Sequence, residues 1–187
     1  INMLNNKLDD IDLVISVDYG HGLITSKIVN YLIDKSKFLA VNTQLNSFNS
    51  SFHSISKYPK SDYVCIHSGE LRHDFRSRYD NEENLMSDLY RKMKLNQLTV
   101  TKGKEGSLAL ANGALVKAPA FANKIVDRVG AGDSLFAITS LCVKKSVPGS
   151  ISLFLGNLYA AASVENMGTE NYSSKVNLLK SVKAMMS

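Results

Sequence analysis

The sequence lacks the features that would mark a membrane, secreted or disulfide-rich protein. Among its 187 residues no apolar run reaches the roughly 18 residues that a membrane-spanning helix needs, and no secretory signal peptide is recognisable. The two cysteines, Cys65 and Cys142, both lie in apolar stretches, which favours buried, reduced thiols over a disulfide or a metal pair. We therefore expect a cytoplasmic protein with no membrane partner.

A concentrated basic region is also absent. The formal net charge is +5, but the lysines are scattered and no basic run is interleaved with aromatic residues. A basic balance of this kind also suits phosphorylated small molecules. We expect no nucleic-acid partner.

The residues that are present suffice for one hydrophobic core. Apolar residues make up 44% of the chain, which is ordinary for a globular protein, and neither internal repeats nor a low-complexity tail is visible. We expect residues 1–187 to form a single α/β domain. Ile1 is not an initiator methionine, so we also expect the chain to begin inside a longer protein.

Short apolar runs alternate with stretches of helical periodicity. The runs predict strands at Ile11–Val17, Phe38–Val41, Tyr63–Ile66 and Gln97–Thr101, and a hairpin of Ser107–Ala111 and Ala114–Lys117. Helices are expected at about 25–34, from about Glu70, and at 82–94, 135–143, 151–167 and 174–185, with Pro148 and Gly149 as a break. This alternation predicts a layered fold with a mainly parallel central sheet flanked by helices.

The turn Gly130-Ala131-Gly132 stands directly before one of these helical stretches. The first turn of a helix has unbonded N–H groups and the positive end of the helix dipole. Glycines let the backbone come close to a ligand. The turn is therefore a candidate anion site, and phosphate is the usual anion.

Asp133 follows this turn at once, where a carboxylate would repel an anion. Two interpretations are open from the residues alone. Asp133 could cap the helix, or it could accept a proton while the N–H groups stabilise charge on a phosphoryl group.

The stretch Asp127–Phe136, preceded by Ala118–Phe121 and Lys124–Val126, resembles the C-terminal signature of the ribokinase (PfkB) family of carbohydrate kinases. The resemblance implies that Asp133 is the general base on the acceptor hydroxyl. It implies that the backbone of Gly130, Ala131 and Gly132 forms the anion hole. It also implies that Asp127 helps to hold a monovalent cation such as K⁺, although Arg128 stands where the family usually has a small residue.

The nucleotide site is also implied by this resemblance. Thr101, Gly103 and Gly106 follow a predicted strand and resemble the family's nucleotide-binding turn. Asn157 stands where the family often has an Asn beside the adenine. ATP with Mg²⁺ is the cofactor that these positions imply.

Two acidic residues complete the implied site. Asp18 ends the first predicted strand, where it is either a turn residue or a substrate-binding residue. Its stretch Asp-Tyr-Gly-x-Gly resembles the heptose-phosphate kinase branch, which usually has Lys at the position of His21. Glu70 matches a family residue near the metal and the phosphates, which would act through water.

Three positions depart from the family pattern. Asn42 and Gln44 replace the Asp and Lys of an Asp-Pro-Lys motif, and His67 replaces an Asn. The polar stretch that continues to about Ser56 is either a substrate loop or a solvated insertion. These departures bear on how metal and phosphate are bound.

The resemblance extends from Asp18 to Gly168 and implies ATP-dependent phosphorylation of a sugar or sugar-phosphate hydroxyl. The family's N-terminal Gly-Gly motif and β lid are not found, so we expect an exposed sheet edge. We expect the segment alone to be weakly active or inactive, or to associate, for example as a homodimer. Two alternatives remain: a nucleotide-binding regulatory module, and the kinase half of a bifunctional kinase and nucleotidyltransferase.

Overall fold

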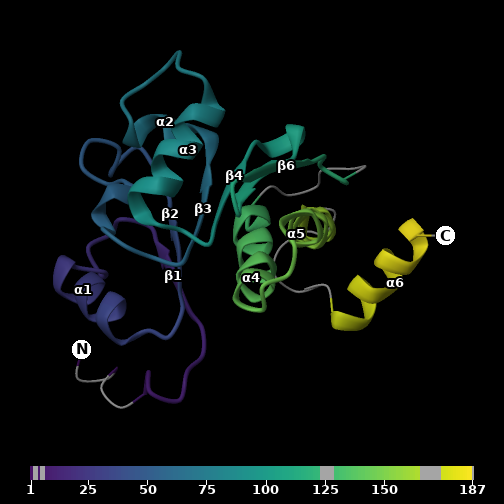
Figure 1. The fold of residues 1–187 in the computed structure, drawn as a ribbon, viewed down its shortest axis with the longest axis horizontal. Helices are drawn as coiled ribbons and strands as arrows, with labels where there is room; N and C mark the ends of the chain where they lie inside the picture. Colours follow the sequence, from purple (N-terminus) through teal and green to yellow (C-terminus); the bar gives the residue numbers. More distant parts are fainter. Residues whose placement is uncertain (2–3, 5–6, 123–128, 165–173, 187) are drawn as a thin grey trace. The chain divides into compact units, whose positions relative to one another are not determined.

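The computed structural model describes residues 1–187 apart from 2–3, 5–6, 123–128, 165–173 and 187 (Figure 1). The chain divides into two compact units. The first unit comprises Ile1–Val100 with Leu110–Ala114, and the second comprises Thr101–Ala109 with Leu115–Ser187. That the whole chain forms a single domain stays a prediction.

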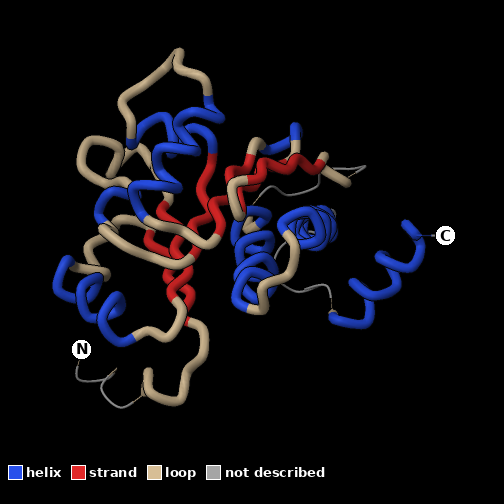
Figure 2. Tube along the Cα trace, viewed as in Figure 1, coloured by secondary structure: helices blue, strands red, loops and turns tan. Residues whose placement is uncertain are grey.

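The described strands form one sheet in the order β1-β2-β3-β4-β5-β6. Strand β1 (Val14–Asp18) pairs in parallel with β2 (Leu39–Thr43), and β2 pairs in parallel with β3 (Tyr63–His67), as the adjacent red segments in Figure 2 show. Every residue of β2 is buried, as expected for a strand covered on both faces. Strands β4 (Gln97–Thr101), β5 (Ser107–Ala111) and β6 (Ala114–Ala118) follow. The predicted α/β fold with a mainly parallel sheet is confirmed.

Three α-helices belong to the first unit: α1 (Ser26–Lys35), α2 (Ser68–Asp74) and α3 (Glu82–Met93). Thr25 and Asn81 cap the first and the last of them through side-chain oxygens that accept backbone N–H bonds. Figure 1 shows α2 beside α3 and β3, in agreement with their contacts. Helix α3 buries Leu85, Met86, Leu89 and Met93, which is the face that its periodicity predicts.

The connection from β2 to β3 contains the short 3₁₀ helix η1 (Ile55–Lys57). Asn49, His53, Ile55 and Tyr58 along this connection are all buried. The stretch is therefore not a solvated insertion along its whole length. Its exposed residues include Phe48 and Phe52, whose rings meet edge to face with centroids 6.2 Å apart.

The second unit contains the 3₁₀ helix η2 (Gly103–Glu105) and the helices α4 (Ala131–Lys144), α5 (Gly149–Val164) and α6 (Lys175–Met186). Gly149, expected in the break between two helices, is instead the first residue of α5. Helices α4 and α5 pack side by side (Figure 1). Gly156 allows their close approach, because a Cβ atom at this position would lie only 2.6 Å from Thr139 Cγ2.

No helix in the described part of the chain combines the length and the apolar character that crossing a membrane requires.

Candidate active site

The start of helix α4 has the geometry of an anion-binding turn. Gly130 occupies the N-cap position with φ +81°, a left-handed conformation that glycine adopts without strain, and no side chain caps the helix there. The helical ladder begins with the N–H of Ser134, which donates to the Gly130 carbonyl at 2.8 Å. The N–H groups of Ala131 and Gly132 precede that bond, at the positive end of the helix dipole.

Asp133 is the third residue of this helix and is half-buried. The interpretation of Asp133 as the N-cap is therefore wrong, because Gly130 holds that position. The turn is also open: a Cβ atom placed at Gly130 or at Gly132 would meet nothing within 4 Å. The backbone at the helix start thus leaves room for a ligand.

The candidate metal residues are less complete. Asp127 and Arg128 lie outside the described residues, so the cation site implied there stays a prediction. The described residues hold no group of three or more His, Cys, Asp or Glu side chains that could bind a metal ion.

Glu70 has a structural role in addition to any role near metal. Its Oε2 accepts the His67 N–H at 2.6 Å, its Oε1 accepts the Leu45 N–H at 3.0 Å, and His67 Nδ1 accepts the Gly69 N–H at 3.0 Å. His67 and Glu70 thus form a capping box at the start of α2. This capping accounts for His67, for which the sequence offered no role.

The candidate nucleotide turn lies between β4 and β5. Gly103 has φ +58°, Gly106 has φ +92°, and the Lys102 N–H donates to the Gly106 carbonyl at 2.8 Å. A Cβ atom at Gly106 would lie 2.1 Å from the Ala118 carbonyl oxygen, whereas one at Gly103 would meet nothing within 4 Å. Gly106 is therefore required by packing, and Gly103 leaves its backbone accessible. Thr101 ends β4 next to this turn.

Asn157 connects helix α5 to strand β5. Its Nδ2 donates to Ser107 Oγ at 2.7 Å and to the Leu153 carbonyl at 3.0 Å, and the residue is 6% exposed. The structure therefore gives Asn157 a packing role within the second unit. Its contact with a nucleotide stays a prediction.

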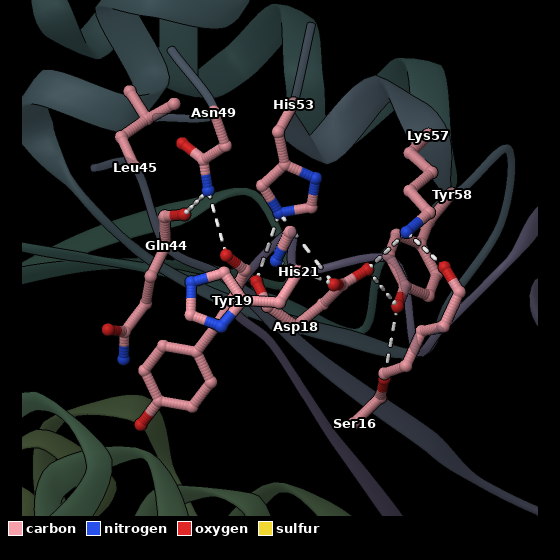
Figure 3. Close-up of polar contacts among 12 residues, drawn as sticks. Ser16, Asp18, Tyr19, His21, Gln44, Leu45, Asn49, His53, Lys57 and Tyr58 are labelled. Atoms are coloured by element: carbon pink, nitrogen blue, oxygen red, sulfur yellow. Dashed lines mark hydrogen bonds and ion pairs between the residues drawn. The ribbon is translucent and has the colours of Figure 1, made fainter. Parts of the chain in front are cut away.

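Asp18 lies at the centre of a buried polar cluster in the first unit (Figure 3). Its Oδ1 accepts the Gly20 N–H at 3.0 Å, and its Oδ2 accepts bonds from Lys57 Nζ at 2.7 Å and from the Tyr58 hydroxyl at 3.0 Å. Only 2% of Asp18 is exposed. The strand end thus places a carboxylate that is satisfied by the protein itself.

The electrostatics of this cluster follow from its contacts. Burial by itself would raise the pKa of Asp18, but hydrogen bonds from Lys57, from the Gly20 N–H and from Tyr58, together with the charge of Lys57, lower that pKa below its ordinary value. Burial and the neighbouring carboxylate raise the pKa of Tyr58. Asp18 is therefore ionised at neutral pH and Tyr58 is protonated.

The partners of Asp18 carry no signal in the sequence that would predict them. Asn49, His53 and Lys57 lie in a polar stretch without a recognisable motif, and Tyr58 follows that stretch. Asn42, one of the three departures, donates its amide to the Cys65 carbonyl at 2.8 Å and so links β2 to β3.

A parallel α/β sheet and a glycine-built turn at a helix start are features that α/β proteins use to bind phosphate. The model of the pfkB family carbohydrate kinases matches residues 25–176. The chain belongs to this family.

The relatives agree with this assignment. The bifunctional protein HldE of Campylobacter jejuni (strain RM1221) is 27% identical over 176 residues, which cover 92% of this chain but only 37% of that protein. The ribokinase of Arabidopsis thaliana complexed with ribose and ATP superposes with a TM-score of 0.78 at 15% identity, covering 96% of this chain and 59% of the ribokinase. An Escherichia coli protein described as ribokinase II, in complex with ATP and Mg²⁺, gives 0.77 at 15% identity over 96% of this chain and 61% of its own. The structures share the ribokinase-like fold.

Proposed function

We propose that the protein transfers the γ-phosphoryl group of ATP to a hydroxyl of a sugar or sugar phosphate. The observation that carries this proposal is the start of α4. There the half-buried carboxylate of Asp133 directly follows the open turn Gly130-Ala131-Gly132. Membership of a carbohydrate kinase family supports it.

The proposed chemistry needs one base and one anion hole. The acceptor oxygen forms a bond to the γ-phosphorus while the bond from that phosphorus to the β,γ-bridging oxygen breaks and ADP leaves. Asp133 takes the hydroxyl proton, and the N–H groups of Ala131 and Gly132 stabilise the charge on the transferred group. Phosphoryl transfer depends mainly on positioning and electrostatics, so these groups can carry much of the catalysis.

The nucleotide would lie along the Gly103–Gly106 turn, where Thr101 and the open backbone at Gly103 are available, with Asn157 near the adenine. Mg²⁺ supplies charge neutralisation when it is bound. It fits Glu70 as an ion held chiefly by phosphates and water, because Glu70 already accepts two backbone N–H bonds. A monovalent cation near Asp127 remains part of the proposal.

The test is sugar-dependent ADP release by the full-length protein with Mg²⁺-ATP. The acceptor panel includes ribose and heptose 7-phosphate, because the chain resembles HldE proteins over nearly its whole length. Asp133→Asn should lower kcat by about 10²–10⁴-fold, the usual contribution of a catalytic base. Asp88→Asn, which alters an exposed carboxylate paired with Arg91, is the matched control and should keep the parental rate. Full turnover by Asp133→Asn would rule out Asp133 as the base.

A second candidate is a nucleotide-binding regulatory module without transfer. The departures at Asn42, Gln44 and His67 favour it, since two of these side chains serve the protein's own hydrogen bonds. Normal ATP binding with no transfer to any sugar in the panel would support this candidate.

The chain spans 37% of the length of the C. jejuni relative, so the complete protein has room for further activities. That relative is a bifunctional protein, and we therefore propose, as an alternative, that this kinase segment belongs to a protein with a second, nucleotidyltransferase activity. Reading the sequence of the full-length protein would decide between a kinase alone and a kinase joined to a nucleotidyltransferase.

We also propose a cytoplasmic location and self-association. Cys65 and Cys142 are both buried and belong to no disulfide, which suits a reducing compartment. Strand β1 ends the strand order of the described sheet and carries the 38% exposed Ile15, and such edges favour pairing, for example in a homodimer. Size-exclusion chromatography with light scattering tests the second point.

A further inference from the structure

We propose that Asp18 does not contact the acceptor sugar but positions the loop Tyr19–Gly22, whose Tyr19 and His21 side chains bind it. The inference rests on the proposed sugar kinase activity. Asp18 would act together with four residues of the β2–β3 connection, here called the anchoring cluster: Asn49, His53, Lys57 and Tyr58.

The anchoring cluster holds the backbone of the loop at several points (Figure 3). Asn49 Nδ2 donates to the Tyr19 carbonyl at 2.8 Å and to the Gln44 carbonyl at 2.9 Å, and His53 Nε2 donates to the Asp18 carbonyl at 3.0 Å. Lys57 Nζ bonds both the Asp18 carboxylate and the Ile24 carbonyl. Lys57 therefore links the two ends of the loop.

The loop also packs tightly against this cluster. Gly20 has φ +69°, and a Cβ atom there would lie 2.5 Å from Asn49 Nδ2 and 2.8 Å from His53 Cγ. Asn49 is 0% exposed and His53 is buried as well, so polar side chains fill the interior at this point. Contacts of this number and closeness hold the loop in one conformation.

The loop exposes two aromatic side chains, those of Tyr19 and His21, to solvent. Tyr19 is 42% exposed, its ring stacks with that of His21 at a centroid distance of 6.3 Å and an interplanar angle of 30°, and His21 is exposed. Asn46 Nδ2 lies 3.4 Å from His21 Nε2. The stacked pair thus presents a flat aromatic surface beside nitrogen groups that can form hydrogen bonds.

This surface suits a sugar or sugar phosphate. A ring face with C–H groups can pack on the tyrosine, while the imidazole and the Asn46 amide can bond hydroxyl or phosphate oxygens. The surface lies at the carboxyl end of β1, where open α/β sheets bind their ligands. Asp18, which is only 2% exposed and is bonded to Gly20, Lys57 and Tyr58, does not offer the same contact.

A buried ion pair is weak evidence of stabilisation, because desolvation offsets much of the attraction between the charges. A loop that merely had to connect β1 to α1 would not need one. The pair of Asp18 and Lys57 is instead explained if it fixes the positions of Tyr19 and His21.

The experiment compares steady-state kinetics of the full-length protein and its variants, with heptose 7-phosphate as the acceptor, or ribose if only ribose releases ADP. His21→Ala and Tyr19→Ala should each raise KM for the acceptor about tenfold, the effect of losing roughly one contact, while KM for ATP stays unchanged. Lys57→Met should raise the acceptor KM in the same way, and Lys57→Arg should restore it in part. Lys92→Met, which removes an exposed lysine that bonds Ser56 Oγ, is the control and should match the parent.

Hydrogen exchange of residues 19–23 gives a readout that does not depend on activity. Exchange in this segment should quicken in Lys57→Met and not in His21→Ala. An unchanged acceptor KM in His21→Ala and Tyr19→Ala, or an equal rise of both KM values in Lys57→Met, would overturn the inference while sugar-dependent ADP release by the parent upheld the kinase. No ADP release by the parent with any sugar would overturn the proposed function itself, and then unchanged exchange in Lys57→Met would overturn the positioning role too.

Discussion

Two glycine-containing turns, one in each unit, use glycine for opposite reasons. At Gly20 an added Cβ atom would collide with Asn49 and His53, whereas at Gly132 it would meet nothing within 4 Å. Gly20 has a positive φ, whereas Gly132 lies inside helix α4. The first glycine lets the chain pack on itself, and the second keeps a backbone uncovered.

The contrast separates structural from ligand-binding use of the same residue type. A glycine that the fold needs should be costly to replace in stability. A glycine that a ligand needs should be harmless to stability and costly to activity. The predictions that follow rank these effects by their expected change in the free energy of unfolding.

Gly20→Ala should have the largest effect. Left-handed backbone costs alanine about 1–2 kcal/mol, and overpacking adds about 1–3 kcal/mol, so a loss on the order of 2–5 kcal/mol is expected. Urea unfolding of the parent and the variant measures it. Gly22→Ala is the matched control, since Gly22 also has a positive φ but nothing within 4 Å of an added Cβ atom, and it should lose only the backbone part. Equal losses for the two variants would show that the contacts with Asn49 and His53 do not matter.

Asn157→Ala should have the next largest effect on stability, because the amide of Asn157 donates hydrogen bonds within the second unit. Removing the amide leaves the buried Ser107 hydroxyl without this donor, which should cost about 1–3 kcal/mol. Thermal unfolding gives the stability, and KM for ATP gives the nucleotide contact. A higher KM for ATP in the folded variant than in the parent would support contact between Asn157 and the adenine. An unchanged KM for ATP would mean that Asn157 serves packing alone.

Gly132→Ala should have a small effect on stability, in the opposite direction. Alanine in a helix is favoured over glycine by roughly 0.5–1 kcal/mol, and no contact opposes the added methyl group. Phosphoryl transfer should nevertheless fall, because the methyl group narrows the approach to the anion turn. Calorimetry and ADP release on the same preparation check both statements. A variant that is both stable and fully active would show that Gly132 is not kept for a ligand.

Motifs and periodicity predicted much of the sheet and of its flanking helices from the sequence. The apolar face of α3, the strand β4 and the hairpin around Asn112-Gly113 follow local rules of burial and turn formation, so their ranges were close to those observed. The sequence also located the turn at Gly130, because glycines before an apolar helix form a local signal.

The partners of Asp18 could not be predicted in the same way. Lys57 and Tyr58 are separated from Asp18 by 39 and 40 positions, and neither belongs to a local pattern. Their role depends on the path of the β2–β3 connection across the end of β1, which is set by tertiary packing. The capping box of His67 and Glu70 is local, but it was not predicted, because the usual N-cap residue of such a box is Ser or Thr and not His.

The pH dependence of stability should show how much the buried pair of Asp18 and Lys57 stabilises the turn that contains Gly20. Asp18 has a pKa that is lower in the folded protein than the ordinary value of 3.8, because the bonds from Lys57, Gly20 and Tyr58 outweigh the effect of burial. The stabilisation from Asp18 is therefore fully present above about pH 4, and it is lost as the pH falls through the folded pKa, where protonation breaks the pair with Lys57. Acid unfolding of the parent should show this loss, and Asp18→Asn should show a shallower decline over the same range after its lower stability at neutral pH. Parallel acid curves for the parent and Asp18→Asn would mean that the buried pair contributes nothing to the stability of the first turn.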